Sequence, residues 1–309
     1  VVLERYGGPE VLQEVTVPRP MPTRGQVLVR TRFIGVNPKD VIVRKGKFKT
    51  LTGKKFPLIV GHDIAGEVVE AGVGADLAVG DLVFGMINDF AGRAYAEYAA
   101  VDSQQLAKAP ASIDLSVAAA VPLAAQTALQ ALRDDAGVQP GQKVLINGAS
   151  GGVGVFAVQI AKILGAEVAA VCSHRNVDLV TELGADRVID YTETELVALD
   201  EQFDAFFDVF GNYNFDRIKH LLGPRGTYVH TIPNARIFME VARTFVRRKR
   251  AKIVIVKSKR DQLDWLRQQV DAGHLRVVVD RSFRLSAAAD AHRYMETKRA
   301  RGKVVLEVG

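Results

Sequence analysis

The stretch that decides the fold is Lys143-Val-Leu-Ile-Asn147, followed by Gly148-Ala-Ser-Gly-Gly-Val-Gly154. The first part is an apolar run with the length and composition of a buried parallel strand. The glycine-dense turn then opens into an apolar helical run over 155–164. A strand, a glycine turn and a helix are the parts of a site that holds a pyrophosphate at a helix N-terminus. The sequence therefore predicts a dinucleotide site here.

The turn is an A-x-G-x-x-G variant when it is aligned on Gly154, and its positions have expected roles. Gly151 would let the backbone approach the pyrophosphate, and Gly154 would let the helix pack closely on the strand. Ser150 and the amides of Gly152 and Val153 complete the cradle at the positive end of the helix dipole. The alternative, a tight turn without a ligand, is disfavoured by the six strands predicted around it.

The second strand of this stretch ends in Cys172-Ser-His-Arg-Asn176, where no carboxylate occurs. In a site for NAD, an Asp or Glu about 20 residues beyond the turn accepts hydrogen bonds from the ribose 2′-hydroxyl. Ser173 and Arg175 instead offer a hydroxyl and a permanent cation, the groups that a 2′-phosphate needs. We therefore expect NADPH rather than NADH, unless Arg175 is only a solvated loop residue. Asn176 at the same tip and Tyr191 after the third strand are further candidate contacts.

Short strands alternate with helices from residue 143 onward. The expected strands are 144–147, 167–171, 187–189, 205–209, 227–231 and 252–257. Six strands joined by crossovers describe an α/β fold with a doubly wound, six-stranded parallel sheet, a Rossmann domain. We expect this dinucleotide-binding domain to span 116–257. The tail, 258–309, is too short to bury a core alone, so we expect it to fold back onto the β-rich segment 1–115.

The composition fits two domains with sizeable cores, since 48% of the 309 residues are hydrophobic and 25% are charged. No run approaches the roughly 18 apolar residues of a membrane span, so no membrane partner is expected. The single cysteine, Cys172, excludes an internal disulfide and a multi-cysteine zinc site. A reducing compartment follows, and the cytoplasm is the simplest one. Because the chain opens at Val1 without Met, an organelle stays open as the alternative.

A basic segment contributes to the formal net charge of +6. Its members are Arg243, Arg247, Arg248, Lys249, Arg250, Lys252, Lys257, Lys259 and Arg260. Such a cluster can attract nucleic acid or an anionic surface. We interpret it as a solvated helix end beside the apolar strand 253–256, because no aromatic interleaving or nucleic-acid motif accompanies the charges. A nucleic-acid partner is therefore not expected.

Further motifs follow in a fixed order along the chain. They are Tyr6-Gly-Gly-Pro9, Gly35-Val-Asn-Pro-Lys-Asp40, Gly61-His-Asp-Ile-Ala-Gly66, Val79-Gly-Asp-Leu-Val-Phe-Gly85, Gly92-Arg-Ala-Tyr-Ala-Glu-Tyr98, Pro122-Leu-Ala-Ala-Gln-Thr-Ala128, Leu183-Gly-Ala-Asp186 and Gly302-Lys-Val-Val305. Together with the glycine turn they resemble the medium-chain dehydrogenase/reductase superfamily, and within it the zinc-independent quinone oxidoreductase branch. The tip 172–176 is similar to that of reticulon-interacting mitochondrial oxidoreductases and their bacterial relatives. The resemblance implies a GroES-like, β-rich catalytic domain that is built from both termini.

The resemblance also bears on zinc. Zinc-dependent members hold the catalytic ion with a Cys, a His and a further Cys or acid, and the cysteine position corresponds here to Asn37. His62 survives, but one imidazole does not make a three-ligand site. The four-cysteine structural zinc loop is absent as well. We therefore expect no metal and interpret His62 as a structural histidine, with a catalytic proton carrier as the alternative.

Without zinc, the enzyme lacks a Lewis acid that could polarise an alcohol. The resemblance instead implies hydride transfer from NADPH to an electron-poor acceptor, either a quinone or the C=C bond of an α,β-unsaturated carbonyl compound. An aldehyde or carbonyl reductase is the runner-up. A cofactor-binding regulatory or RNA-binding protein with little catalysis is the alternative from another class, and the basic segment is the feature that favours it.

The resemblance places Asn37 and Asp40 on the substrate side of the active site, where Asn37 would donate to a carbonyl oxygen. Tyr95 is a second candidate donor, or else a packed strand aromatic. Lys303 would reach a cofactor phosphate or close a salt bridge. Residues expected to cradle the nicotinamide and its ribose are Thr127, Val209, Phe210, His230 and Thr231. No side chain stands out as the proton donor, so we assign that role to solvent.

The predicted strand 253–256 ends the sheet. Its free edge is suited to pairing across a two-fold axis, as in the dimers of this superfamily. A homodimer is therefore expected.

Overall fold

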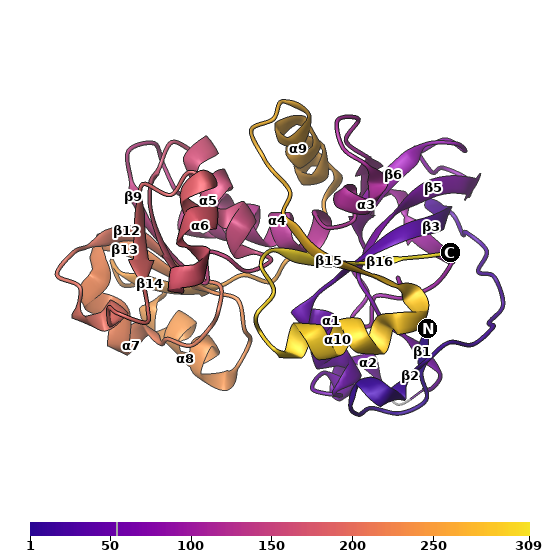
Figure 1. Cartoon of the computed structure of the whole chain (residues 1–309), viewed down its shortest axis with the longest axis horizontal. Coiled ribbons are helices and arrows are strands. Elements are labelled where there is room, and N and C mark those ends of the chain that lie inside the picture. The colour runs from indigo at the N-terminus through magenta and orange to yellow at the C-terminus, as the bar shows by residue number, and fades with distance from the viewer. Residues whose placement is uncertain (54) are drawn as a thin grey trace. The chain divides into compact units, whose positions relative to one another are not determined.

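The computed structural model describes residues 1–53 and 55–309, and its contacts divide the chain into two compact units. The first unit consists of Val1–Gln126, Lys257–Gly273 and Val277–Gly309. The second consists of Thr127–Val256 and His274–Arg276. Figure 1 labels the helices and strands of both units, and each unit has β-sheet structure of its own.

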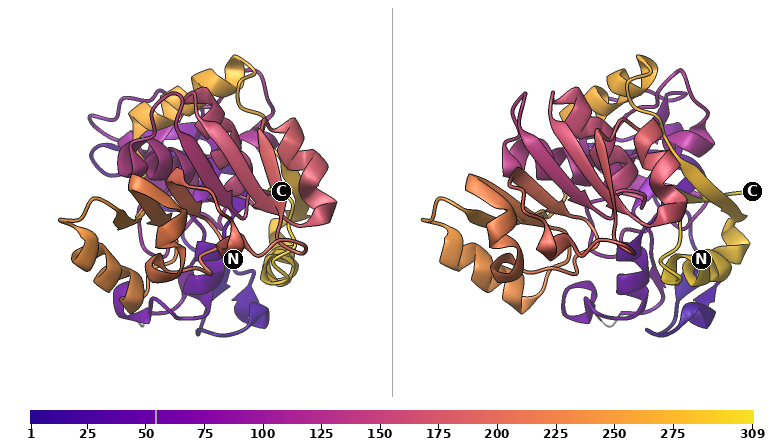
Figure 2. Two further views of the ribbon diagram at one scale, coloured as in Figure 1. Left: turned by 90° about the vertical axis from the view of Figure 1, so that its left-hand side faces the viewer. Right: turned by 60° about the vertical axis from the view of Figure 1, so that its left-hand side comes forward.

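The second unit contains a six-stranded parallel sheet in the order β11-β10-β9-β12-β13-β14. Its strands are β9 Lys143–Asn147, β10 Glu167–Cys172, β11 Arg187–Asp190, β12 Phe203–Asp208, β13 Leu222–His230 and β14 Arg250–Ile253. Counted from the first strand, this is the 3-2-1-4-5-6 order of doubly wound dinucleotide-binding domains. The predicted α/β class with a six-stranded doubly wound sheet is confirmed, and Figure 2 shows the strands from two further directions.

Helices cover this sheet. They are η3 Gln130–Ala136, which is a π-helix, α5 Gly154–Ile163, α6 Val177–Glu182, α7 Phe215–Ile218 and α8 Ala235–Thr244. Helix α5 packs on β9 and β10, α6 on β10 and β11, and α8 on β14. Val144, Leu145 and Ile146 of β9 are consequently all fully buried. This burial explains why the central strand reads as an unbroken apolar run.

The sheet reverses its strand order around β9. Asn147, the last residue of β9, pairs in register with Val171 of β10 on one side and with Asp208 of β12 on the other. In open α/β sheets, ligands bind outside the carboxyl ends of the strands at such a switch point. The glycine turn follows Asn147 directly, so it lies at this position.

The first unit contains a seven-stranded sheet in the order β15-β16-β3-β5-β6-β8, with β7 paired to β3. Its strands are β3 Gln26–Val36, β5 Asp63–Ala71, β6 Leu82–Met86, β7 Tyr98–Asp102, β8 Leu106–Lys108, β15 Val279–Arg284 and β16 Lys303–Glu307. A small sheet is formed by β1 Val2–Leu3, β2 Leu12–Gln13 and β4 Leu58–Ile59. The helices are α1 Pro38–Arg44, α2 Lys49–Thr52, α3 Leu115–Ala118, α9 Arg260–Asp271 and α10 Ala288–Glu296, while α4 Pro122–Leu129 crosses the boundary between the units.

Strand β16 pairs antiparallel with β3, with Val304 opposite Val36. The last strand of the chain thus completes a sheet that begins near its N-terminus. A β-rich unit made from both ends of the chain is what the resemblance implied.

One strand differs from its prediction. The sequence placed a strand over 252–257, but β14 is Arg250–Ile253. The amide of Val254 still donates to the His230 carbonyl, at 3.0 Å, and β13 ends at that residue. No β13 residue continues the ladder beyond it, and Ile255 is exposed. The prediction of an edge strand at 253–256 was therefore wrong by several residues.

Candidate functional site

The glycine turn is tied to the neighbouring strand and packed against its own helix. The amides of Gly148 and Ala149 both donate to the Val171 carbonyl, at 3.2 and 3.0 Å. Gly148 has φ +81°, in the left-handed region that favours glycine. At Gly154, an added Cβ would lie 2.1 Å from the Gly148 carbonyl oxygen. Only glycine fits there, as the close helix–strand approach requires.

Gly151 occupies a different environment. A Cβ at this position would meet, among the described residues, only the Gly148 carbonyl oxygen at 3.4 Å. The backbone of Gly151 is therefore open on its outer side. Within residues 1–53 and 55–309 no side chain caps helix α5, whose N-cap is Val153, and Gly152 and Val153 are partly exposed at this end. An open glycine beside an uncapped helix N-terminus fits an anionic diphosphate.

A buried asparagine joins the turn to the tip of β10. The Asn176 amide nitrogen donates to the Ser150 hydroxyl at 2.9 Å and to the Ser173 hydroxyl at 3.3 Å. Asn176 is 6% exposed, whereas Arg175 next to it is exposed. Three of the predicted cofactor residues therefore lie together, with the Arg175 cation beside them in the chain. Hydroxyls and a guanidinium are the donors that a ribose 2′-phosphate requires.

The adjacent strand places a carboxylate near this tip, which sequence reasoning missed. Asp190 ends β11 and pairs in register with Cys172. Its Oδ1 accepts from the Thr192 amide and hydroxyl, at 2.9 and 2.7 Å, and the Thr192 amide is the largest of the effects that lower the pKa of Asp190. Asp190 Oδ2 lies 3.6 Å from Nδ1 of the exposed His174. The predicted contact Tyr191 comes next and is exposed.

The carboxyl ends of β12 and β13 are organised by a second acid that was missed, Asp208. This fully buried carboxylate accepts from the side-chain amide of Asn147 at 2.7 Å and from the Tyr228 hydroxyl at 3.0 Å. It also accepts from the backbone amides of Gly211 and Tyr213, at 2.8 and 3.0 Å. It shapes the turn that carries the predicted residues Val209 and Phe210. The sequence held one signal for it, an acid near the end of the apolar strand predicted over 205–209.

The predicted residues after β13 contact the same turn. The Thr231 hydroxyl donates to the Val209 carbonyl at 2.9 Å. His230 is buried, and its Nδ1 accepts from the Ile232 amide at 3.0 Å. Thr127, the last of the predicted nicotinamide contacts, is buried in α4.

The first unit holds a buried polar cluster around Asn37. The Asn37 amide nitrogen donates to Asp63 Oδ2 at 2.9 Å and to the Gly35 carbonyl at 3.2 Å. The Lys303 ammonium donates to Asn37 Oδ1 at 2.5 Å and lies 3.5 Å from Asp63 Oδ2. Burial raises the pKa of Asp63 and lowers that of Lys303, and each charge opposes the shift of the other. Of the two roles predicted for Lys303, the salt bridge is the one present here.

Asp40 joins this cluster to His62. The Asn37 backbone amide donates to Asp40 Oδ2 at 2.8 Å, and Asp40 Oδ1 lies 2.6 Å from His62 Nδ1. Both side chains are fully buried. His62 Nε2 has no hydrogen-bond partner among the described residues. The sequence had singled out Asn37 and Asp40, but not this pairing with His62.

Tyr95 is placed by a partner far away in the chain. Its hydroxyl lies 2.9 Å from Nε2 of His292 on α10. Burial lowers the pKa of His292 to about 4 and raises that of Tyr95 well above its usual value. The phenol is therefore neutral and hydrogen-bonded to a neutral imidazole at ordinary pH.

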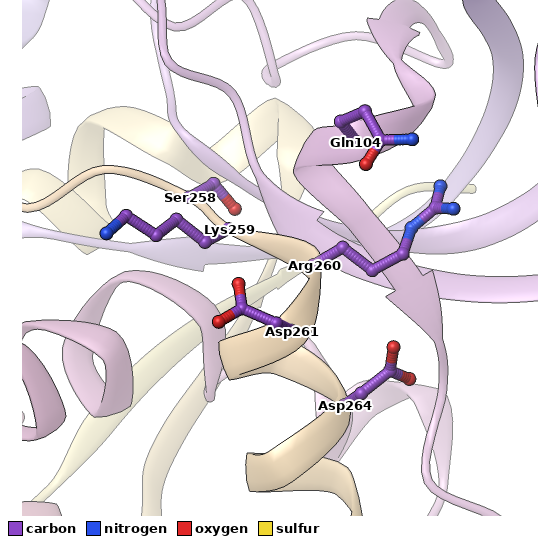
Figure 3. A pocket seen from close by; sticks show the side chains of 6 residues that line it. All are labelled: Gln104, Ser258, Lys259, Arg260, Asp261 and Asp264. Atoms are coloured by element: carbon purple, nitrogen blue, oxygen red, sulfur yellow. The ribbon is translucent and has the colours of Figure 1, made fainter.

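A pocket in the first unit and a cluster of possible metal ligands in the second unit do not form a cofactor or substrate site. A pocket of about 520 Å³ is lined by Gln104, Ser258, Lys259, Arg260, Asp261 and Asp264. Figure 3 shows the Arg260 side chain extending toward Gln104, and its guanidinium is already bonded to Asp76 and to the Ser103 and Leu106 carbonyls. In the described residues, His174, Asp190 and Glu193 bring potential metal ligands within 4.8 Å of one another, but exposed acidic groups of this kind are common without an ion.

These units define a class: a GroES-like β-rich unit together with a Rossmann unit is the architecture of NAD(P)-dependent dehydrogenases and reductases. Comparison with known proteins agrees. Residues 23–111 match the family described as "Alcohol dehydrogenase GroES-like domain", and residues 183–306 match "Zinc-binding dehydrogenase". The chain belongs to the medium-chain dehydrogenase/reductase superfamily.

The relatives carry names from the predicted branch. The "Chloroplast envelope quinone oxidoreductase homolog" of Arabidopsis thaliana is 34% identical over 97% of this chain and 95% of its own length. "NADPH-dependent alkenal/one oxidoreductase, chloroplastic" from the same plant is 35% identical over 99% of this chain and 78% of its length. The human "NAD(P)H oxidoreductase RTN4IP1, mitochondrial" is 31% identical over 99% and 88%. The resemblance to the quinone oxidoreductase branch is confirmed, and independence of zinc stays a prediction.

A solved structure agrees over the whole chain. The quinone oxidoreductase from Coxiella burnetii superposes with a TM-score of 0.92 at 31% identity, covering 100% of this chain and 98% of that one.

Proposed function

We propose that this chain is an NADPH-dependent oxidoreductase that reduces a quinone or the C=C bond of an α,β-unsaturated carbonyl compound. The observation that carries the proposal is the link from Ser150 through Asn176 to Ser173, beside Arg175. This link connects the glycine turn, which is suited to a diphosphate, with the residues after β10, which are suited to a 2′-phosphate. The names of the relatives support this reading, since they include quinone and alkenal/one oxidoreductases.

The residues of the second unit would bind and orient the cofactor. The open amides at the start of α5 would hold the diphosphate, and Ser173 and Arg175 the 2′-phosphate. We assign Val209, Phe210, His230, Thr231 and Thr127 to the nicotinamide end. When bound, NADPH supplies the hydride. We assign Tyr191 and Asn176 to the adenosine end, where Asn176 acts by positioning the two serines.

The buried cluster of the first unit would handle the acceptor. Both hydrogens of the Asn37 amide are used, and the bond to Gly35 is the longer one. We propose that a substrate carbonyl displaces this bond, while Asp63 and Lys303 hold the amide in place. Tyr95 can donate to substrate only if its contact with His292 opens, so we propose Asn37 as the principal donor.

We also propose that the reaction needs no metal. The Lys303 ammonium already lies against Asn37 Oδ1, the side-chain oxygen at the position of a zinc-ligating cysteine. Activity that survives a chelator, together with elemental analysis that finds no stoichiometric zinc, is the expected result. Loss of activity on chelation, restored by added zinc, would refute the proposal.

We propose that the first unit is the catalytic domain and the second unit the dinucleotide-binding domain. The sequence predicts 1–115 with 258–309 and 116–257 for these domains, whereas the contacts first divide the chain after Gln126. We propose a homodimer. We propose a reducing compartment, the cytoplasm or the interior of an organelle, as expected for a chain whose one cysteine is buried.

A substrate screen tests the proposed function. Purified protein is supplied with NADPH and, in turn, a benzoquinone, an alkenone and an aldehyde, and the products are identified by mass spectrometry. Hydroquinone or saturated ketone is the expected product. Alcohol formed from the aldehyde alone would support the carbonyl-reductase alternative. Binding of NADPH without turnover of any acceptor would support the regulatory alternative.

A further inference from the structure

One short segment of the second unit carries as much net charge as the whole chain. Between residues 236 and 252 there are seven basic residues and one acidic residue, a net charge of +6. The whole chain has 41 basic and 35 acidic residues, which is also +6. The remaining 292 residues are therefore neutral as a set, with 34 of each sign.

The structure turns the acid of this segment inward and leaves cations outside. Glu240 is buried, where it accepts from the Phe215 amide at 3.2 Å and from Arg236 at 3.3 Å. Arg243 is paired with Asp216 at 2.8 Å. The side chains of Arg247 and Arg248 are exposed and have no ion-pair or hydrogen-bond partner within the described part of the chain.

The same segment exposes large apolar side chains. Phe238, Met239, Phe245 and Val246 are 48, 66, 75 and 89% exposed. The first two lie on the outer face of α8, whose inner face buries Ile237, Glu240 and Thr244. An isolated exposed apolar residue needs no explanation, but four within nine residues form a patch.

The apolar residues are presented by an ordered turn. The buried Thr244 hydroxyl donates to the Glu240 carbonyl at 2.7 Å and accepts from the Ala251 amide at 2.8 Å. The Arg247 amide donates back to the Thr244 carbonyl at 2.9 Å. These bonds anchor both ends of the turn 245–250, so Phe245 and Val246 project beside Arg247 and Arg248. Figure 1 shows α8, which leads into this turn, next to β14.

We propose that α8 and the turn 245–250 form a docking surface for a membrane that contains anionic lipid. Cations flanking exposed Phe, Met and Val side chains are the combination that places a helix at the boundary of headgroups and acyl chains. Each cation near an anionic surface adds to the attraction, and the apolar side chains enter the boundary layer. A second copy that docked face to face on residues 245–248 would bring like charges together. The pairing proposed for the homodimer uses the edge of β14, Arg250–Ile253, instead.

This binding is peripheral, and it differs from the expectation, drawn from the sequence, that the chain has no membrane partner. No helix in residues 1–53 or 55–309 is long and apolar enough to cross a bilayer. The basic segment was interpreted as a solvated helix end, because the exposure of Phe245 and Val246 is not visible in the sequence. The proposal does not rest on the proposed function.

The test is sedimentation of the full chain with vesicles of phosphatidylcholine alone and of phosphatidylcholine mixed with phosphatidylglycerol. The wild type is expected to bind the mixed vesicles and not the neutral ones. Arg247→Glu/Arg248→Glu should weaken this binding roughly 30-fold or more, because two attractive charges are reversed. Phe245→Ser/Val246→Ser should weaken it roughly tenfold or more, because the apolar contact is lost.

Matched variants separate the patch from general effects. Arg299→Glu/Arg301→Glu makes the same change in net charge at two exposed arginines outside the segment, and Val73→Ser/Val79→Ser removes two exposed valines elsewhere. Both should bind mixed vesicles as the wild type does. All variants change exposed side chains, so unaltered thermal unfolding and NADPH affinity are expected and show that a loss of binding is specific.

Several results would overturn the proposal. One is a wild type that binds neither kind of vesicle, and another is an equal loss in the matched variants. Binding of single-stranded RNA that depends on Arg247 and Arg248, without vesicle binding, would establish a nucleic-acid surface instead. Light scattering that shows Phe245→Ser/Val246→Ser converting a dimer to a monomer, with vesicle binding unchanged, would assign the patch to a second copy of the chain.

Discussion

Arg175 is the residue to which we assign the choice between the two nicotinamide cofactors. It is exposed and lies two residues from Ser173 in the chain. Asn176 links Ser173 to the glycine turn by donating hydrogen bonds to the hydroxyls of Ser173 and Ser150. Arg175→Ala should reduce the ratio of NADPH to NADH affinity by about tenfold to a hundredfold, because a charge-assisted hydrogen bond to phosphate contributes about 1.5–3 kcal/mol. Fluorescence titration with both cofactors measures the ratio.

Arg225→Ala is the control for this substitution. Arg225 is an exposed arginine of the same unit, in β13 and away from the carboxyl end of that strand. Its removal should leave the cofactor ratio unchanged. An unchanged ratio in Arg175→Ala would remove Arg175 from the site.

Lys303 compensates a buried charge. Lys303→Met leaves the buried Asp63 carboxyl without its ion-pair partner, which should lower the free energy of unfolding by roughly 3–5 kcal/mol at neutral pH. The double variant Asp63→Asn/Lys303→Met removes both charges and should recover much of this loss. Chemical unfolding of the three proteins measures the differences. A double variant as unstable as the single one would show that the charge is not the cause.

The loss of folding stability caused by Lys303→Met should depend on pH. Burial raises the pKa of Asp63, and Lys303 is the strongest influence that lowers it, so the substitution raises this pKa further. A carboxyl with a raised folded pKa contributes stability below its unfolded pKa and loses it as the pH rises through the folded value. The deficit in stability of the variant relative to the wild type should therefore shrink as the pH falls from neutrality toward the unfolded pKa of the carboxyl. A constant or growing deficit would contradict this assignment.

For single residues, the sequence predicted groups that are neighbours in the chain and missed contacts between residues that are far apart in it. Ser173, Arg175 and Asn176 follow one strand, so their chemistry was visible in five consecutive residues. Asp208 was missed because its role depends on Asn147 and Tyr228, which the sheet brings to it from far along the chain. The contact between Tyr95 and His292 spans 197 positions, and no local pattern indicates it.

At the scale of the element, two glycines of one turn should behave differently. Gly154→Ala would place a Cβ 2.1 Å from a backbone oxygen, so the turn must shift, and a loss of stability of roughly 1–3 kcal/mol is expected. Gly151→Ala meets only an ordinary contact at 3.4 Å, so it should fold normally. Its methyl group would instead obstruct the diphosphate and weaken NADPH binding roughly tenfold or more.

Thermal unfolding without cofactor, followed by NADPH titration, distinguishes the two variants. Equal melting temperatures with full NADPH affinity in Gly151→Ala would contradict the predicted role of that glycine. Each variant serves as the control for the other, since both add one methyl group to the same turn.

Elements with a strong pattern were predicted well, and those set by tertiary contacts were not. The strands around the glycine turn were foreseen because a sheet buried on both faces needs continuous apolar runs. Strand β14 ends earlier than its apolar run because its partner β13 ends at His230. The π-helical segment Gln130–Ala136 had no recognisable signal in the sequence.

At the scale of the whole molecule, the parallel sheet ends at β14, whose outer edge has no strand partner among the described residues. We expect two copies of the chain to pair along β14 across a two-fold axis. Light scattering should therefore give twice the chain mass of 33.6 kDa. A mass of one chain over the accessible range of concentrations would contradict the dimer.

This chain is proposed to transfer a hydride from NADPH to a quinone or to the C=C bond of an α,β-unsaturated carbonyl compound without a metal. The most direct measurement follows NADPH absorbance after the protein is mixed with NADPH and, in turn, a benzoquinone and an alkenone in the presence of a chelator. The predicted result is NADPH oxidation with at least one of the two acceptors at a rate proportional to the protein, with one hydroquinone or one saturated ketone formed for each NADPH consumed. Oxidation with both acceptors no faster than in the absence of protein, under conditions where NADPH is shown to bind, would contradict the claim.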